Sequence, residues 1–310
     1  MSDNIIFMGT SKFAVPILEK ISESKLNISA VYTQPPKKSS RGMRIQKTPI
    51  HVKSELLGLP IRTPNSLKNN IDEHSFIKKI KPTIVVVISY GQIIPKEFLD
   101  LSKNGFLNIH ASILPKFRGA APIQRAIMSQ DIETGISFMK INEHLDAGPV
   151  LETYKIKIDL DLNATELQEK LSQLAALKII EIIVSIISGK ANFKEQDHSK
   201  ATYAEKINKA EGKIFWNDSA KKIIGKINGL HPNPGAYFIF KGDRYKILKA
   251  EIGNGIGKAG EVLTDKLEIA CSNNQSIKIL EIQRQGKKVQ KIGEFLLGSQ
   301  IKKGAVISNA

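Results

Sequence analysis

The chain has 310 residues, of which 41% are hydrophobic and one is a cysteine, so it can bury a full core without an internal disulfide. Lys and Arg outnumber Asp and Glu by 46 to 30, and the net charge of +16 indicates a polyanionic partner such as a nucleic acid. The sequence has neither an apolar run of the roughly 18 to 20 residues that a membrane span needs nor a secretory leader, so we expect a cytoplasmic protein without a membrane anchor.

The first half of the chain alternates β-prone apolar runs with segments of helical periodicity. We expect strands at residues 4–10, 28–33, 83–89 and 105–111, and helices at 13–24, 50–57 and 122–130. Two strands at 134–141 and 150–158 and a long amphipathic helix at 164–188 extend the pattern. This alternation is typical of an α/β fold with a doubly wound, largely parallel, Rossmann-like sheet.

The last third of the chain changes character. A polar stretch at 190–208 precedes a short amphipathic helix at 219–230 and five strand candidates at 237–240, 244–252, 260–263, 267–271 and 277–283. Short strands with Gly and Asn turns predict a small β-barrel that is OB-like. We therefore expect a catalytic domain at 1–189, a linker at 190–208 and a basic β-barrel domain at 209–310.

Charge is concentrated in this last part. Residues 211–310 hold 17 Lys and Arg against 9 Asp and Glu, a net of +8, and the preceding 210 residues carry the same net charge. The doubled charge density favours contact with a polyanion, and the alternative is a lysine-rich surface with no such partner.

The residues for chemistry cluster at the end of the strand expected at 105–111. Asn108 and His110 are two apart on that strand, so both side chains face the same side, at an edge where open α/β sheets bind ligands. Asp146, if close, would favour the protonated and strongly donating form of His110. An amide and an imidazole can together hold a developing oxyanion, which is typically worth about 10²- to 10³-fold in rate. The set suits acyl transfer to an external nucleophile, since the sequence has neither a GxSxG motif nor an HExxH motif.

A family resemblance follows from these residues. Positions 108–124 read Asn-Ile-His-Ala-Ser-Ile-Leu-Pro-Lys-Phe-Arg-Gly-Ala-Ala-Pro-Ile-Gln, and together with 145–148 they resemble the catalytic signature of the 10-formyltetrahydrofolate-dependent formyltransferases. Similarities at 9–14, 33–35, 86–95 and 202–207 extend the resemblance over nearly the whole chain. The form Arg-Gly-Ala-Ala-Pro-Ile-Gln at 118–124 resembles the branch of this family that formylates methionyl-tRNA.

The resemblance implies a reaction and a folate site. A formyl group would pass from 10-formyltetrahydrofolate to the amino group of methionyl-initiator-tRNA, with Asn108 and His110 on the formyl oxygen, Asp146 setting the state of His110, and no metal. The implied folate contacts are Ser89, Tyr90, Gly91, Gln92, Ile93, Ile94, Pro95, Ser112, Ile113, Leu114, Pro115, Leu145 and Gly148.

The resemblance also implies contacts to tRNA. In the family, a loop after the second strand enters the acceptor end of the tRNA, and its arginine matches Arg41 in the basic segment 37–47. The implied tRNA contacts are Lys37, Lys38, Arg41, Arg44, Lys47 and Arg118, and the basic C-terminal domain resembles the family's tRNA-binding barrel. A bacterial, monomeric, cytoplasmic enzyme is the expected setting.

Two alternatives stay open. Formyltransferases acting on an amino-sugar nucleotide share the Asn/His/Asp set and can carry a C-terminal β-domain, but the basic loop and the charged last third favour tRNA. A non-catalytic RNA-binding protein on a former enzyme scaffold would be expected to have a damaged catalytic set, whereas Asn108, His110 and Asp146 are intact.

Overall fold

The computed structural model describes residues 3–39 and 44–308, which form two compact units. The first comprises Met1–Gly119, Gly135–Ile156 and Gln168–Tyr203, and the second comprises Ala120–Thr134, Lys157–Leu167 and Ala204–Ala310. These units differ from the predicted domains because two segments before residue 189 pack with the C-terminal residues. Arg125, for example, pairs through Nη2 with Oε1 of Glu211 at 3.2 Å, and the Asn228 amide donates to the Leu160 carbonyl at 2.9 Å.

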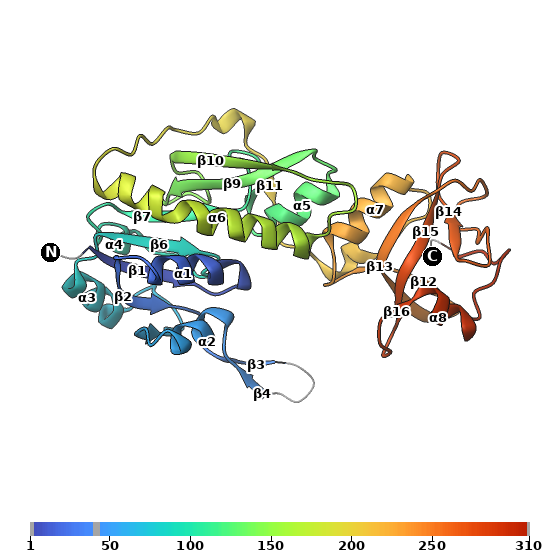
Figure 1. Ribbon diagram of the computed structural model, residues 1–310, viewed down its shortest axis with the longest axis horizontal. Helices are drawn as coiled ribbons and strands as arrows, with labels where there is room; N and C mark the ends of the chain where they lie inside the picture. The colour runs from blue at the N-terminus through green and yellow to red at the C-terminus, as the bar shows by residue number, and fades with distance from the viewer. Residues whose placement is uncertain (1–2, 40–43, 309–310) are drawn as a thin grey trace. The chain divides into compact units, whose positions relative to one another are not determined.

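The first unit is built on a seven-stranded sheet of order β10-β9-β7-β6-β1-β2-β5 (Figure 1). β1 lies parallel to β2 and β6, β2 to β5, and β6 to β7, whereas β9 runs antiparallel to β7. The Rossmann-like, largely parallel sheet is therefore confirmed. The strands are β1 Asn4–Gly9, β2 Asn27–Tyr32, β5 Ile61–Arg62, β6 Ile84–Ile88, β7 Phe106–His110, β9 Glu133–Lys140 and β10 Val150–Lys157.

Local signals explain where the helices begin. α2, at Pro49–Leu56, is capped by the Thr48 hydroxyl, and α7, at Ala220–Gly229, by the Ser219 hydroxyl. The remaining helices are α1 Val15–Ser22, α3 Ile71–Ile80, α4 Lys96–Leu99, α5 Pro122–Met128, α6 Ala164–Ile187 and α8 Ile292–Leu297, with the 3₁₀ turns η1 Lys12–Ala14, η2 His198–Lys200 and η3 Lys209–Gly212.

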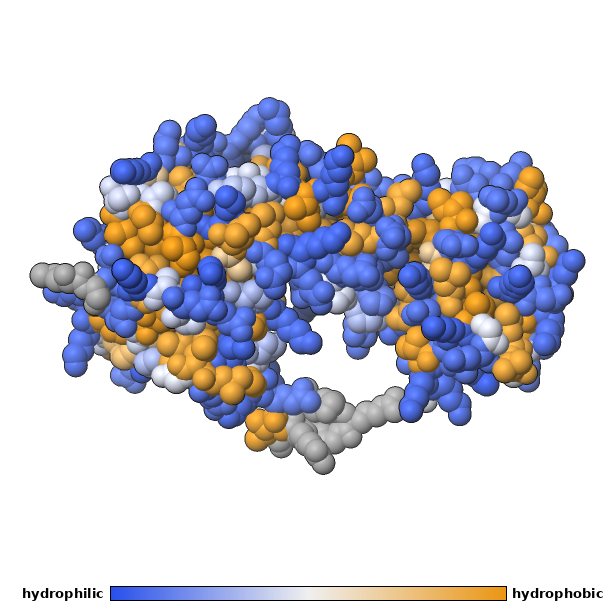
Figure 2. Space-filling model, viewed as in Figure 1, coloured by the Kyte–Doolittle hydropathy of each residue, from blue (hydrophilic) through white to orange (hydrophobic). Residues whose placement is uncertain are grey.

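Both faces of the main sheet are buried at its central strands β1 and β6. On one face, alternate residues of β1, β2 and β6 pack with Ile77 of α3 and Phe98 of α4 in one apolar cluster. On the other face, α6 and α1 lie beside each other (Figure 1), and Ser172 of α6 donates to the Phe13 carbonyl at 2.6 Å. Hydrophobic residues show among hydrophilic ones where α6 and α1 reach the surface (Figure 2). Burial on both faces is why these strands read as continuous apolar runs in the sequence.

The second unit contains the antiparallel strands expected in the last third of the chain. They form a five-stranded sheet of order β12-β13-β15-β14, with β16 paired to β15, around a core that includes Trp216, Phe238 and Phe295. The strand predicted at 260–263 was wrong: isolated bridges from Glu261 and Val262 stand there. Closure of the sheet into a barrel stays a prediction. The strands are β12 Ala236–Phe240, β13 Asp243–Gly253, β14 Glu268–Ala270, β15 Ser276–Arg284 and β16 Gln290–Lys291.

Two small strand pairs complete the described structure. β3, at Lys37–Ser39, lies antiparallel to β4, at Arg44–Gln46, so the basic segment after β2 is flanked by a short ladder. β8, at Arg118–Gly119, pairs with β11, at Tyr203–Ala204. Within residues 3–39 and 44–308, none of the helices has the length and apolar character needed to cross a bilayer.

Candidate active site

Three parallel strands end at the same edge of the main sheet. Gly9 of β1 lies opposite Ile88 of β6, and Val87 of β6 lies opposite Asn108 of β7. The segment 89–95 after β6 and the turn after His110 therefore leave the sheet side by side. Asn108 is half-buried and His110 is buried, and both point to the same face of β7 as predicted from their spacing.

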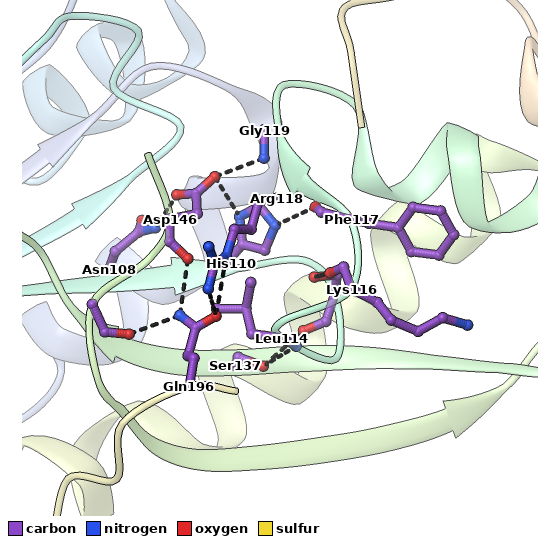
Figure 3. Close-up of polar contacts among 12 residues, drawn as sticks. Asn108, His110, Leu114, Lys116, Phe117, Arg118, Gly119, Ser137, Asp146 and Gln196 are labelled. Atoms are coloured by element: carbon purple, nitrogen blue, oxygen red, sulfur yellow. Dashed lines mark hydrogen bonds and ion pairs between the residues drawn. The ribbon is translucent and has the colours of Figure 1, made fainter. Parts of the chain in front are cut away.

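The Asp146 carboxylate brings the three predicted catalytic residues together (Figure 3). The Asn108 amide donates to its Oδ1 across 3.4 Å, and Nδ1 of His110 lies 3.5 Å from its Oδ2. The backbone N–H of Gly119 donates to Oδ2 at 2.8 Å. Asp146 comes from the loop between β9 and β10, so segments 38 residues apart in sequence meet at one carboxylate.

The two ring nitrogens of His110 both face oxygen atoms. Nε2 lies 2.8 Å from the Phe117 carbonyl, and Nδ1 faces the Asp146 carboxylate (Figure 3). Both oxygens are acceptors, so an imidazole protonated on both nitrogens donates to each of them. The contact through Nδ1 is long, as is the Asn108 contact, so the carboxylate holds neither donor tightly.

The turn after β7 has a structural hydrogen-bond network. Ser112 donates to the Lys116 carbonyl at 2.6 Å, and Ser137 of β9 donates to the Ser112 carbonyl at 2.8 Å. The Leu114 N–H donates to the Ser137 hydroxyl at 3.1 Å. Ser112 is fully buried and its hydroxyl holds the turn, and its place in the floor of a folate site stays a prediction.

The predicted folate segments supply exposed apolar side chains. Ile93 is 89% exposed and Leu145 is 65% exposed, so both side chains are accessible to a ligand. Tyr90 is instead buried, and its carbonyl accepts from the Thr10 hydroxyl at 2.8 Å and from the Gln34 amide at 3.3 Å. Burial raises the pKa of Tyr90, so its phenol stays neutral and serves packing. The folate contacts stay a prediction.

The predicted tRNA residues fall into two groups. Lys37 and Lys47 are exposed beside the short ladder of β3 and β4, in which Lys38 and Arg44 lie, and Arg41 lies outside the described residues. Arg118 is only 3% exposed, so its predicted contact with tRNA does not match its position in this structure. Its guanidinium donates inward to the Gln196 side chain, because a buried charge needs acceptors around it.

Gln196 was not predicted as a site residue. It lies in the polar stretch predicted as a linker, and it contacts both Arg118 and the backbone of Asp146 (Figure 3). A single glutamine among other polar residues forms no sequence pattern from which a contact in the site could be predicted. Its role follows only from the path of residues 190–203 across the first unit.

Comparisons with known proteins agree over the full chain. The family profile described as "Formyl transferase" matches residues 3–183, and that described as "Formyl transferase, C-terminal domain" matches 206–300. A methionyl-tRNA formyltransferase of Pelagibacter ubique is 59% identical over 309 residues, which cover all of both chains. One of Brucella melitensis is 40% identical over 96% of this chain and 99% of its own.

Solved structures share the fold at low identity. WlaRD, a sugar 3N-formyl transferase crystallised with dTDP and 5-N-formyl-THF, has a TM-score of 0.69 at 19% identity, covering 93% of this chain and all of its own. HypX of Aquifex aeolicus in complex with tetrahydrofolic acid has a TM-score of 0.64 at 16% identity, covering 96% of this chain and 48% of its own. These likenesses concern the fold alone.

Proposed function

Because the chain belongs to the formyl transferase family, we propose that it transfers a formyl group from 10-formyltetrahydrofolate to the free amino group of methionyl-initiator-tRNA. The convergence of Asn108, His110 and Asp146 carries the proposal, since it places an amide donor, an imidazole and a carboxylate around one point at the ligand-binding edge of the sheet. The identity to the Pelagibacter ubique enzyme over its full length supports methionyl-tRNA as the acceptor.

The geometry supports distinct tasks for the three side chains. The methionyl nitrogen attacks the formyl carbon, and the oxygen that becomes negative accepts hydrogen bonds from Asn108 Nδ2 and His110 Nδ1. Asp146 faces both donors and orients the imidazole. The Phe117 carbonyl holds the opposite ring nitrogen, so the imidazole keeps one orientation while its Nδ1 serves the reaction.

The proton balance sets the second task of the site. One bond forms between the methionyl nitrogen and the formyl carbon, and the bond from that carbon to N10 of the folate breaks. The attacking amine loses one proton and the departing N10 gains one. In this arrangement the Asp146 carboxylate can accept the proton that the amine loses, and the N–H of His110 Nδ1 can supply the proton that N10 gains.

The basic parts of the chain supply the acceptor side of the proposal. The exposed Lys37 and Lys47 flank the segment that matches the family's tRNA-entering loop, and the charged C-terminal residues add phosphate contacts. The flat ring of the folate covers the exposed Ile93 and Leu145 side chains. A cytoplasmic location, where charged tRNA and reduced folate occur together, is part of the same proposal.

A transfer assay tests this function. The purified protein is mixed with 10-formyltetrahydrofolate and methionyl-initiator-tRNA, and the amino acid released from the tRNA is analysed by mass. N-formylmethionine is the expected product. A matched tRNA whose methionyl amine is already acetylated provides the control and yields no formyl product. Absence of formylmethionine with the unblocked substrate would refute the proposal.

A further inference from the structure

We propose that Gln196 is a positioning residue for Asp146, held in its own orientation by Arg118. The inference rests on the proposed formyl transfer and concerns how the carboxylate that contacts His110 and Asn108 is kept in place. It assigns a task in the site to a residue of the polar segment after α6.

One amide nitrogen spans the turn that carries Asp146. Nε2 of Gln196 lies 2.9 Å from the Asp146 carbonyl (Figure 3). The same nitrogen lies 2.7 Å from the Gly148 carbonyl. An amide nitrogen has two N–H groups, so each carbonyl receives one. Gln196 is 8% exposed, and the two bonds are shielded from competing water.

Arg118 fixes which way the Gln196 amide faces. Nε and Nη2 of the guanidinium lie 3.2 Å and 2.7 Å from Oε1 of Gln196. A guanidinium only donates, so the amide oxygen faces Arg118 and the amide nitrogen faces the two carbonyls. Nη2 also lies 3.0 Å from Nδ1 of His198 and donates its second N–H to it, so this nitrogen is held by two acceptors.

The turn held by Gln196 is one that needs support. Asp146 has φ +46°, in the left-handed region that a residue with a side chain rarely adopts. Gly148 lies so close to β9 that an added Cβ would be 1.9 Å from the Lys140 carbonyl oxygen. Relaxation of Asp146 toward an ordinary conformation would carry its carboxylate away from His110, and the two Gln196 bonds oppose that movement.

Two substitutions distinguish the role of the N–H donors of the Gln196 amide from that of its oxygen, which accepts from Arg118. Gln196→Met keeps the shape and removes every hydrogen bond, whereas Gln196→Glu keeps an oxygen for Arg118 and removes the N–H donors. Because misplacement of a reacting group by about 1 Å can cost 10²-fold, we expect kcat to fall by about 10- to 100-fold in both variants. KM for each substrate should change by less than about threefold, since neither substrate touches Gln196 in the proposed site.

A double-substitution cycle distinguishes positioning from general structural support. If Gln196 acts through the carboxylate, Gln196→Met in an Asp146→Ala background should lower kcat by less than about twofold. Asn228→Leu is the matched control, because Asn228 is also a buried amide that donates to a backbone carbonyl, that of Leu160 at 2.9 Å. It should lower the melting temperature and leave kcat unchanged.

Failure of the role proposed for Gln196 can be distinguished from failure of the proposed function. Wild-type protein that fails to formylate methionyl-tRNA refutes the proposed function. An active wild type with undiminished kcat in Gln196→Glu overturns the role of Gln196, as does a further tenfold loss from Gln196→Met in the Asp146→Ala background. Thermal unfolding of each variant shows whether that variant folds. If Gln196→Met does not fold, Gln196→Glu replaces it in the double-substitution cycle.

Discussion

In the proposed reaction, the chemistry depends most on His110. It is 6% exposed, one ring nitrogen is held by the Phe117 carbonyl, and the other faces Asp146. Replacement by alanine removes a donor to the developing oxyanion and the partner of the carboxylate. We expect His110→Ala to lower the rate constant for single-turnover formylation by at least about 10²-fold.

A second histidine supplies the control for that prediction. His144 is exposed and lies two residues from Asp146 in the same loop. His144→Ala should retain kcat within about twofold, because this imidazole is not part of the converging set. Near-normal activity in His110→Ala would contradict the assigned role.

The sequence predicted the three side chains that converge at the candidate site but not the residues that hold them. Asn108, His110 and Asp146 stand in a recognisable signature, and their convergence in space follows it. Arg118 stands in the same signature, yet its burial depends on a partner 78 residues away that no local pattern reveals. An arginine in a motif usually indicates that the motif binds an anion. The Arg118 guanidinium instead donates to the neutral side-chain amide of Gln196.

Among the structural elements, the turn from β9 to β10 is tightly constrained. Gly148 has no room for a side chain, because an added Cβ would overlap the Lys140 carbonyl oxygen at 1.9 Å. We expect Gly148→Ala to lower the free energy of unfolding by more than about 2 kcal/mol and to reduce kcat by displacing Asp146.

Chemical denaturation measures this change in stability. Gly293, in α8, has no neighbouring atom within 4 Å of an added Cβ, so Gly293→Ala should be neutral or stabilising. Equal stability of the two variants would show that the turn can yield, against the packing described.

A helix-to-sheet connection in the second unit predicts a pH dependence. Burial lowers the pKa of His231, which the nearby Glu166 and Glu281 oppose and Lys246 reinforces. The unfolded chain then binds a proton that the folded chain resists, so stability rises with pH in this range. The contribution is complete above the ordinary pKa of 6.5 and is lost as the pH falls through the lower pKa of the folded state.

When the pH is lowered from 7 to 5, we expect the free energy of unfolding to fall less in His231→Gln than in the wild type. Urea unfolding at the two pH values measures the difference. The same loss in both proteins would mean that His231 is not the group responsible.

Long buried elements were easier to predict than short or polar ones. β1, β6 and β7 are buried on both sides and read as apolar runs, so their limits differ from those expected by one residue at each end or less. α3 was missed because its sequence is mostly polar and only Ile77 and Glu73 are buried in it. The 260–263 segment has β-prone residues, but bridges from single residues replace a continuous ladder.

Across the whole molecule, charge predicts how binding to tRNA responds to salt. Contacts between lysines and phosphates release counterions, so affinity falls steeply as salt rises. We expect the dissociation constant for methionyl-tRNA to increase at least about tenfold between 50 and 200 mM salt, measured by filter binding. Binding that is independent of salt would contradict a basic tRNA interface.

A pair of exposed lysines refines that measurement. Lys287 and Lys288 lie between β15 and β16, and their joint replacement by alanine should reduce the salt dependence. Lys78 and Lys79 of α3 are also adjacent and exposed, so their joint replacement removes the same charge elsewhere and serves as the control. An equal effect of both pairs would assign the salt dependence to net charge alone.

The choice of acceptor is the central claim, and a ratio of specificity constants tests it most directly. With 10-formyltetrahydrofolate as the common donor, kcat/KM is measured for methionyl-initiator-tRNA and for an amino-sugar nucleotide. We predict a value for the tRNA at least about 10³-fold higher, since a site built to bind one acceptor leaves its polar groups unpaired with the other. A higher value for the sugar nucleotide would contradict the account.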